Sequence, residues 1–270
     1  MSKLQITTTI LAIALIASMI GNIYLITQTT PSNATTRVEM VNTLNQIQVK
    51  IDTELSRMGQ SLAYAAEQLS TTGLTGTQAD TILTALAANS TYIVDAGTQN
   101  MDNIMVAVQP AEYKDTIGQY VGEQKWLNTN PNGDITPVMT PVITMIEGFQ
   151  GNAIAAPVFN TDKAQIGVVS IIFDPQELLT ASIQAVTEDT QYEFTVMQPN
   201  GLILFDSHSQ TLVNFFTETT NTEVLAVGHQ IAQTSSGYST YTTDGQAKQS
   251  YWTTISAYGQ EWRLITHHTN

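Results

Sequence analysis

The feature that most constrains the fold is the stretch 149–179, in which two apolar runs flank a short polar segment. The runs are Asn152–Phe159 and Gln165–Phe173, and the segment between them reads Asn160-Thr161-Asp162-Lys163. The β-branched and aromatic residues of the runs favour strands, and the polar segment favours a turn. Because the second run is apolar almost throughout, both of its faces should be buried. The stretch therefore predicts an antiparallel hairpin at the centre of a sheet.

The end of this stretch carries the signals of a helix start. Asp174 can cap a helix whose first residue is Pro175, and Glu177 stands three residues after the cap, as in a capping box. We expect the hairpin to lead directly into a helix.

Charge and composition exclude several classes of partner and site. The 270 residues include 9 Lys+Arg against 23 Asp+Glu, which gives a formal net charge of −14. Such a surface repels nucleic acid and anionic lipid headgroups, so we predict no nucleic-acid partner. Cys is absent, which excludes thiolate metal sites, disulfides and cysteine catalysis. The length suffices for an N-terminal segment and two small domains.

The N-terminal segment is apolar. Residues 6–26 carry no charge, and at about 1.5 Å per residue they would span roughly 30 Å, the thickness of a bilayer core. A cleaved signal peptide is the alternative, but its apolar core is normally shorter and no clear small-x-small site follows. We therefore predict a single-pass anchor at residues 6–27 after a cytoplasmic stub at residues 1–5. Lys3 precedes the anchor, which places the bulk of the chain outside the cell membrane.

A long helix is predicted next, at residues 32–70. Its apolar residues recur in steps of three and four, at Met40, Leu44, Ile47, Ile51, Leu55, Met58, Leu62, Ala65 and Leu69. The mean step is about 3.6, the period of a straight helix, whereas a coiled-coil seam needs about 3.5. The stripe is therefore expected to pack along the folded body of its own chain, with dimerisation through this helix as the less supported alternative. Gly73 and Gly76 should end the helix.

The remaining elements follow from local patterns. A short helix is expected at 77–88, a strand at 103–108, and a pocket-lining loop with short helical turns at 111–128. After a polar boundary at 183–190, a second hairpin is expected around Gln198-Pro199-Asn200-Gly201. An amphipathic helix should then precede an antiparallel meander, with the helix at 223–233 and the strands at 237–242, 249–257 and 261–267.

These patterns resemble the Cache family of extracytoplasmic sensor domains, also called PDC sensors. In the first half the resemblance rests on the strand that ends in Pro157-Val158-Phe159, on Ile166-Gly167-Val168-Val169-Ser170, and on the Asp174-Pro175 helix start. In the second half it rests on Met197-Gln198-Pro199-Asn200-Gly201, Ile203-Leu204-Phe205-Asp206-Ser207, Tyr251-Trp252-Thr253 and Gly259-Gln260-Glu261-Trp262-Arg263-Leu264.

The resemblance implies an α+β fold of double Cache type. An N-terminal transmembrane helix and a long stalk helix would be followed by two PAS-like antiparallel-sheet lobes. The membrane-distal lobe would comprise residues 71–183, and the membrane-proximal lobe residues 184–268.

No catalytic or metal site is predicted. The four histidines, His208, His229, His267 and His268, show no metal-ligand spacing. Asp206-Ser207-His208 contains the residue types of a hydrolase triad, but neighbours in sequence cannot easily form the required relay, so it is interpreted as a structural turn. A calcium loop beginning at Asn128 would place Met139 where a bidentate Glu is required. We also predict no cofactor.

The candidate ligand site lies around the expected 111–128 loop and the start of the first hairpin. A small-molecule pocket needs an apolar wall and a few convergent polar groups. Trp126 can supply the wall and Lys125 a cation for a carboxylate. The full predicted set is Tyr120, Gln124, Lys125, Trp126, Glu147 and Asn152. The alternative interpretation is that Trp126 belongs to the core and Lys125 to the surface.

The candidate site departs from its family pattern. In amino-acid-binding double Cache domains the matching loop ends in Arg, any residue, Trp, Tyr. Here the four positions read Gln124, Lys125, Trp126 and Leu127, so the Arg and the Tyr are missing and Lys125 is only a partial replacement.

The resulting hypothesis is a non-enzymatic, membrane-anchored extracytoplasmic sensor that binds a small molecule in its distal lobe. The ligand is expected to be an amino acid, a carboxylate or an amine. The chain would lack a cytoplasmic output of its own and act through a membrane signalling partner or as a homodimer. The alternatives are a structural cell-surface protein without a ligand and, less supported, an exported hydrolase.

Overall fold

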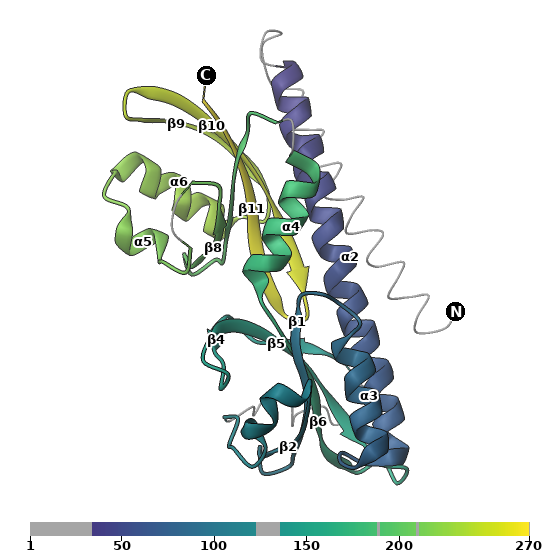
Figure 1. The fold of residues 1–270 in the computed structure, drawn as a ribbon. Helices are drawn as coiled ribbons and strands as arrows, with labels where there is room; N and C mark the ends of the chain where they lie inside the picture. The colour runs from purple at the N-terminus through teal and green to yellow at the C-terminus, as the bar shows by residue number, and fades with distance from the viewer. Residues whose placement is uncertain (1–33, 123–135, 188–189, 209–210, 270) are drawn as a thin grey trace. The chain divides into compact units, whose positions relative to one another are not determined.

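The computed structural model describes residues 34–122, 136–187, 190–208 and 211–269 (Figure 1). The chain divides into two compact units. The first unit consists of the described residues of Thr53–Leu178 together with Ala257–Gln260. The second unit contains the described residues up to Asp52, those of Leu179–Ser256, and those from Glu261 onward.

The predicted long helix is α2, Ala34–Thr72, drawn in purple to blue in Figure 1. Every residue of its apolar stripe is buried. In the second unit the amide of Gln48 donates to the carbonyl of Thr254 at 3.0 Å, and in the first unit the hydroxyl of Tyr258 donates to the carbonyl of Leu55 at 3.1 Å. The stripe thus packs on its own chain, as predicted, and the helix ends just before Gly73, whose φ is +82°.

The first unit is built on a six-stranded sheet with the strand order β2-β1-β6-β5-β3, and β4 also pairs with β5. The predicted hairpin is β5 and β6, which pair antiparallel from Asn152↔Phe173 to Phe159↔Gln165. The strands are β1 Ile93–Asn100, β2 Met105–Gln109, β3 Val138–Met139, β4 Ile143–Thr144, β5 Gln150–Phe159 and β6 Gln165–Phe173.

Local hydrogen bonds explain both ends of β6. In the turn before it, the side-chain oxygen of Asn160 accepts from the backbone N–H of Asp162 at 3.0 Å and of Ala164 at 2.9 Å. After it, the carboxylate of Asp174 accepts from the N–H of Gln176 at 2.8 Å and caps α4, Pro175–Thr187. The N–H of Asp174 donates to the carbonyl of Tyr92 at 3.3 Å, so the cap is present without the reciprocal bond of a capping box.

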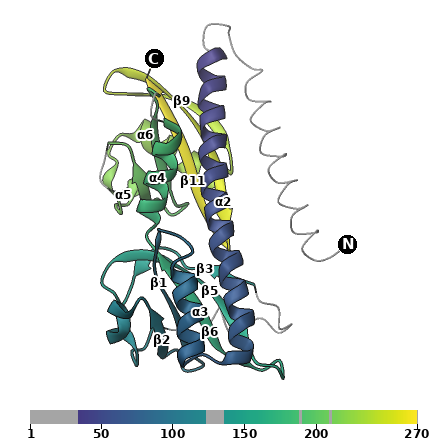
Figure 2. The ribbon, with the colours of Figure 1, turned by 45° about the vertical axis from the view of Figure 1, so that its right-hand side comes forward.

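The helices of the first unit cover one face of its sheet. The short helix α3, Thr77–Ala87, packs on β1 and β2 and lies beside the first-unit end of α2 in both views (Figures 1 and 2). After β2 the chain forms a 3-10 turn, η2, Ala111–Thr116, in the segment where short helical turns were predicted. The remainder of the expected pocket-lining loop, residues 123–128, lies outside the described residues.

The second unit has a five-stranded sheet with the order β8-β7-β11-β10-β9. All of its strands were predicted, and so was α6, Thr222–Gln233; the short α5, Phe215–Glu218, was not. The strands are β7 Glu193–Met197, β8 Ile203–Asp206, β9 Gly237–Thr243, β10 Gln246–Ala257 and β11 Gln260–Thr269.

The two faces of the second sheet pack on different helices. On β10 the side chain of Thr253 donates to Gln48 of α2 at 3.2 Å, whereas its neighbour Trp252 belongs to a buried apolar cluster with Val227 and Ile231 of α6. Successive side chains of a strand point to opposite faces. The sheet is therefore enclosed between α2 on one face and α6 on the other.

Among the described residues, no helix is both long and apolar enough to cross a bilayer. The anchor predicted at residues 6–27 lies outside that part of the chain.

Candidate ligand-binding sites

The first unit buries a carboxyl group on the face of its sheet that is opposite to α3. Asp95 lies on β1 and is fully buried, and the strand register places it on the same face as Ile172 and Ala153. Neither carboxyl oxygen of Asp95 has a hydrogen-bond partner among the described residues. A buried polar group without a partner costs free energy, so this arrangement requires an explanation beyond packing.

Glu147 reaches the same region from the turn between β4 and β5. The N–H of Met145 donates to the carbonyl of Phe149 at 2.8 Å, and the turn includes Gly148 with φ +89°. Met145 and Phe149 pack against Ala153, which anchors the turn on the sheet face that carries Asp95. Both carboxyl oxygens of Glu147 are buried and, within the described chain, have no hydrogen-bond partner.

The two acids influence each other electrostatically. Burial, and then the neighbouring Glu147 carboxylate, raise the pKa of Asp95 to about 8. The same charges also contribute to a raised pKa of Tyr113, after the effects of its partial burial and of Glu112. Asp95 and Glu147, here called the carboxyl pair, therefore form a local concentration of acceptors without a described cation nearby.

The other predicted site residues are distributed differently. Asn152 is buried and lies on the opposite face of β5 from Ala153; its side-chain N–H donates to the carbonyl of Thr140 at 2.7 Å, and its own oxygen has no partner in the described chain. Tyr120 forms a β-bridge with Ile104 and is 53 % exposed. Gln124, Lys125 and Trp126 lie outside the described residues, so their part in the site stays a prediction.

Sequence reasoning included Glu147 among the candidate site residues but did not include Asp95, because β1 was not predicted. Apart from Ile93 and Val94, the strand consists of Asp, Ala, Gly, Thr, Gln and Asn, which have little strand preference as a group. The one sequence signal that could have indicated Asp95 is its position as an isolated acid directly after the β-branched residues Ile93 and Val94.

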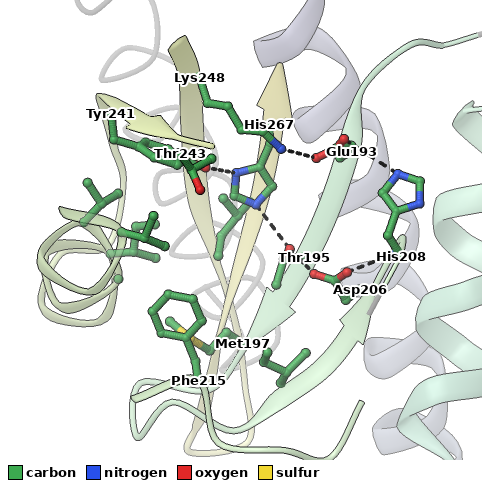
Figure 3. Close-up of a pocket in the computed structure, with 16 residues that line it drawn as sticks. Glu193, Thr195, Met197, Asp206, His208, Phe215, Tyr241, Thr243, Lys248 and His267 are labelled. Atoms are coloured by element: carbon green, nitrogen blue, oxygen red, sulfur yellow. Dashed lines mark hydrogen bonds and ion pairs between the residues drawn. The ribbon is translucent and has the colours of Figure 1, made fainter. Parts of the chain in front are cut away.

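The second unit contains a separate cavity of about 330 Å³, here called the C-terminal cavity, between its sheet and α6 (Figure 3). Glu193, Lys248 and Thr243 lie at one end, and Met197 and Phe215 at the other (Figure 3). His267 and His208, which the sequence assigned only to a strand end and a turn, both line it.

Comparison with known proteins agrees with this architecture. Residues 53–175, a little under half of the chain, match the family model described as HK/GC/chemotaxis protein-like sensor domain. No curated protein sequence is significantly similar to the chain.

Several solved structures are similar. An extracellular ligand binding receptor from Desulfohalobium retbaense is 28% identical with a TM-score of 0.74; the match covers 85% of this chain but 40% of that one. The ligand-binding domain of the Pseudomonas aeruginosa amino acid chemoreceptor PctB, in complex with L-Arg, is 13% identical with a TM-score of 0.61 and coverages of 89% and 97%. The periplasmic sensory domain of the Campylobacter jejuni chemoreceptor Tlp1 is 14% identical with a TM-score of 0.60 and coverages of 85% and 92%.

The predicted order of a long helix followed by two antiparallel sheets is thus confirmed, and the family resemblance with it. The chain has the double Cache fold of extracytoplasmic sensor domains, and its residues 53–175 match the model of the HK/GC/chemotaxis protein-like sensor domain.

Proposed function

We propose that this protein is a membrane-anchored extracytoplasmic sensor whose first unit binds a small molecule bearing a protonated amine. The observation that carries the proposal is the carboxyl pair: Asp95 and Glu147 together present four buried oxygens that have no partner outside the pair in the described chain. The proton that Asp95 retains at neutral pH can serve only one contact between the two carboxyl groups, so the remaining oxygens have no donor. An ammonium group supplies three donors and one positive charge, which is what the pair lacks.

The surrounding groups fit a compact ligand. Ala153 and Ile172 on the same sheet face, with Met145 and Phe149 of the turn, provide apolar surface next to the carboxyl pair. The bond from Asn152 to Thr140 holds the segment that leads to β4 and so to Glu147. PctB, a structural neighbour, was solved with the amino acid L-Arg, which carries such an amine. Amino acids are therefore the first compounds to test.

In this proposal residues 6–27 anchor the chain and the two lobes lie outside the membrane. Ligand binding would change the position of α2, which contributes residues to both units, and would thereby act on a membrane signalling partner or a second copy. The domain limits given above, 71–183 and 184–268, remain part of this proposal. No enzymatic step is included in it.

Calorimetric titration of the full-length chain in lipid nanodiscs tests the amine. A panel of L-amino acids and simple amines is titrated beside the N-acetylated form of each compound. Because charge-assisted hydrogen bonds to the pair would be lost, N-acetylation, Asp95→Asn and Glu147→Gln should each weaken binding by about 10- to 100-fold. Binding should also release a proton from Asp95 at pH 7, which makes the heat depend on the ionisation enthalpy of the buffer.

Two exposed acids of the first unit provide matched controls. Asp102→Asn and Glu67→Gln change the same charges at exposed positions and should leave the affinity unchanged. Equal affinity for an amine and its N-acetylated form, or equal affinity in the wild type and both pair variants, contradicts the proposal. Flat titrations with the whole panel would favour a structural protein without a ligand.

A further inference from the structure

The C-terminal cavity belongs entirely to the second unit and therefore does not depend on the ligand proposed for the first. Its centre is a hydrogen-bonded chain of side chains. Thr195 donates to the carboxylate of Asp206 at 2.7 Å, so its oxygen is left to accept from Nε2–H of His267 at 3.2 Å. Nδ1 of His267 then accepts from the hydroxyl of Ser250 at 2.7 Å. These bonds fix the imidazole in one tautomer and one orientation.

His267 is neutral in this position. The ring keeps some accessible surface because it lines the cavity, yet protein encloses it, and this burial lowers its pKa to about 4. Asp206 is engaged by Thr195 and by the backbone N–H of His208 at 2.9 Å. The polar side chains at the centre of the cavity thus already bond one another, so they offer a ligand few free hydrogen-bonding groups.

The uncommitted polar groups lie at one end. Nζ of Lys248 donates to Oε2 of Glu193 at 3.0 Å, which uses one of its three N–H groups. The other oxygen of Glu193 is 3.7 Å from Nε2 of His208, too far for a hydrogen bond. The side chains of Lys248 and Glu193 are 20% and 36% exposed, so solutes can reach both. The ammonium group of Lys248 and the carboxylate of Glu193 therefore lie side by side, and each can form further hydrogen bonds.

The opposite end is apolar. Met197, Ile203 and Ile265 come from the sheet, and Val227, Ile231 and Phe215 from the helices that cover it. Gly228 is required for this wall, because a Cβ there would stand 2.1 Å from Cε1 of Phe215. One end of the cavity therefore carries both charges, and the other end is aliphatic and aromatic. Its volume is near the lower limit for small-molecule pockets, which is about 300 Å³.

We propose that the C-terminal cavity binds a small zwitterion with an apolar tail. Its ammonium would bond the free oxygen of Glu193 and its carboxylate the free N–H groups of Lys248. Its tail would lie on Met197, Ile265 and Val227. A molecule with only an ammonium group would leave the free N–H groups of Lys248 without an acceptor. A molecule with only a carboxylate would leave the free oxygen of Glu193 without a donor. The cavity would thus give the chain a second ligand site.

Three probes with the same branched tail test the charge requirement: L-leucine, 3-methylbutylamine and 4-methylpentanoate. In calorimetric titrations of the full-length chain in nanodiscs, leucine should bind at least about tenfold more tightly to this cavity than the other two. Glu193→Gln should remove its advantage over 4-methylpentanoate, and Lys248→Met its advantage over 3-methylbutylamine. The exposed controls Glu218→Gln and Lys50→Met should behave as the wild type.

The site is separated from the carboxyl pair by measuring each variant beside Asp95→Asn. Leucine binding that persists in Asp95→Asn but weakens in Glu193→Gln and Lys248→Met supports the second site. Binding that is lost in Asp95→Asn and unchanged in the other two overturns it, as does a lack of binding by all three probes. Should a variant fail to fold, methyl NMR of the wild type decides: leucine should shift the Met197 and Ile265 resonances, and unshifted resonances contradict the proposal.

Discussion

At the scale of single residues, the two sites differ in how their buried polar groups are satisfied. His267 has protein partners for both ring nitrogens, whereas Asp95 and Glu147 have none outside the pair in the described chain. A satisfied group fixes a structure, and an unsatisfied one stores a free-energy cost that a ligand can remove. The carboxyl pair is therefore expected to make the ligand-free protein sensitive to pH.

The raised pKa of Asp95 determines whether stability rises or falls with pH. The folded state holds the proton of Asp95 up to about pH 8, while the unfolded chain releases it near pH 3.8. The contribution of this proton to the free energy of unfolding is fully present below pH 3.8 and is lost as the pH rises to about 8. Calorimetric melting without ligand should show the melting temperature of Asp95→Asn rising relative to the wild type between pH 5 and pH 9.

Comparison between variants is needed because other groups titrate in the same range. The pKa of Asp52 is raised to about 6 by burial, which acts in the same direction, and that of His267 is lowered, which acts in the opposite one. Both are present in the wild type and in Asp95→Asn and cancel in the difference. The exposed variant Asp102→Asn should follow the wild type, and parallel melting profiles of wild type and Asp95→Asn would refute the assignment.

At the scale of elements, sequence patterns predicted those whose periodicity or turn chemistry is strong. The stripe from Met40 to Leu69 and the capped hairpin of β5 and β6 have the predicted type and nearly the predicted limits. Strand β1 was missed because its conformation is imposed by its neighbours β2 and β6, not by its own residues. Since β1 carries Asp95, half of the carboxyl pair could not be found from the sequence.

Residue 59 of α2 shows how a tertiary contact overrides helix preference. Glycine is unfavourable inside a helix, but a Cβ at Gly59 would stand 2.0 Å from the hydroxyl oxygen of Tyr258. We expect Gly59→Ala to lower the free energy of unfolding by about 1–3 kcal/mol, because the tyrosine ring must move. Urea unfolding monitored by circular dichroism measures the change.

A double-mutant cycle identifies the cause. If the ring is the obstacle, Gly59→Ala should cost much less in a Tyr258→Ala background than in the wild type. Equal costs in the two backgrounds would show that the ring of Tyr258 is not the reason for glycine at this position.

At the scale of the whole molecule, the two units repeat one topology. The sheet orders are β2-β1-β6-β5-β3 and β8-β7-β11-β10-β9. When β4, which lies off this path, is left out and the strands of each sheet are numbered in chain order, both orders become 2-1-5-4-3. The duplication is one of strand order and does not depend on a repeated residue pattern. Each unit nevertheless carries its candidate site on the face of the sheet that α2 and α3 leave open.

The acidic composition also acts on the molecule as a whole. A formal charge of −14 destabilises the folded state by self-repulsion, which salt screens. Raising NaCl from 10 to 150 mM at pH 7 should therefore raise the melting temperature. The effect should shrink near pH 4, where about half of the carboxyl groups are protonated, and a salt effect of the same size at both pH values would point to another cause.

The position of β11 in the centre of the second sheet has a consequence for synthesis. Its partners β7 and β10 cannot be joined until Gln260–Thr269 has been made, and the contact of Gln48 with Thr254 spans 206 residues. Contacts this distant in sequence form slowly. During synthesis the second unit therefore remains incomplete until β11 has emerged, and until then the part of α2 in this unit lacks the strands that cover it.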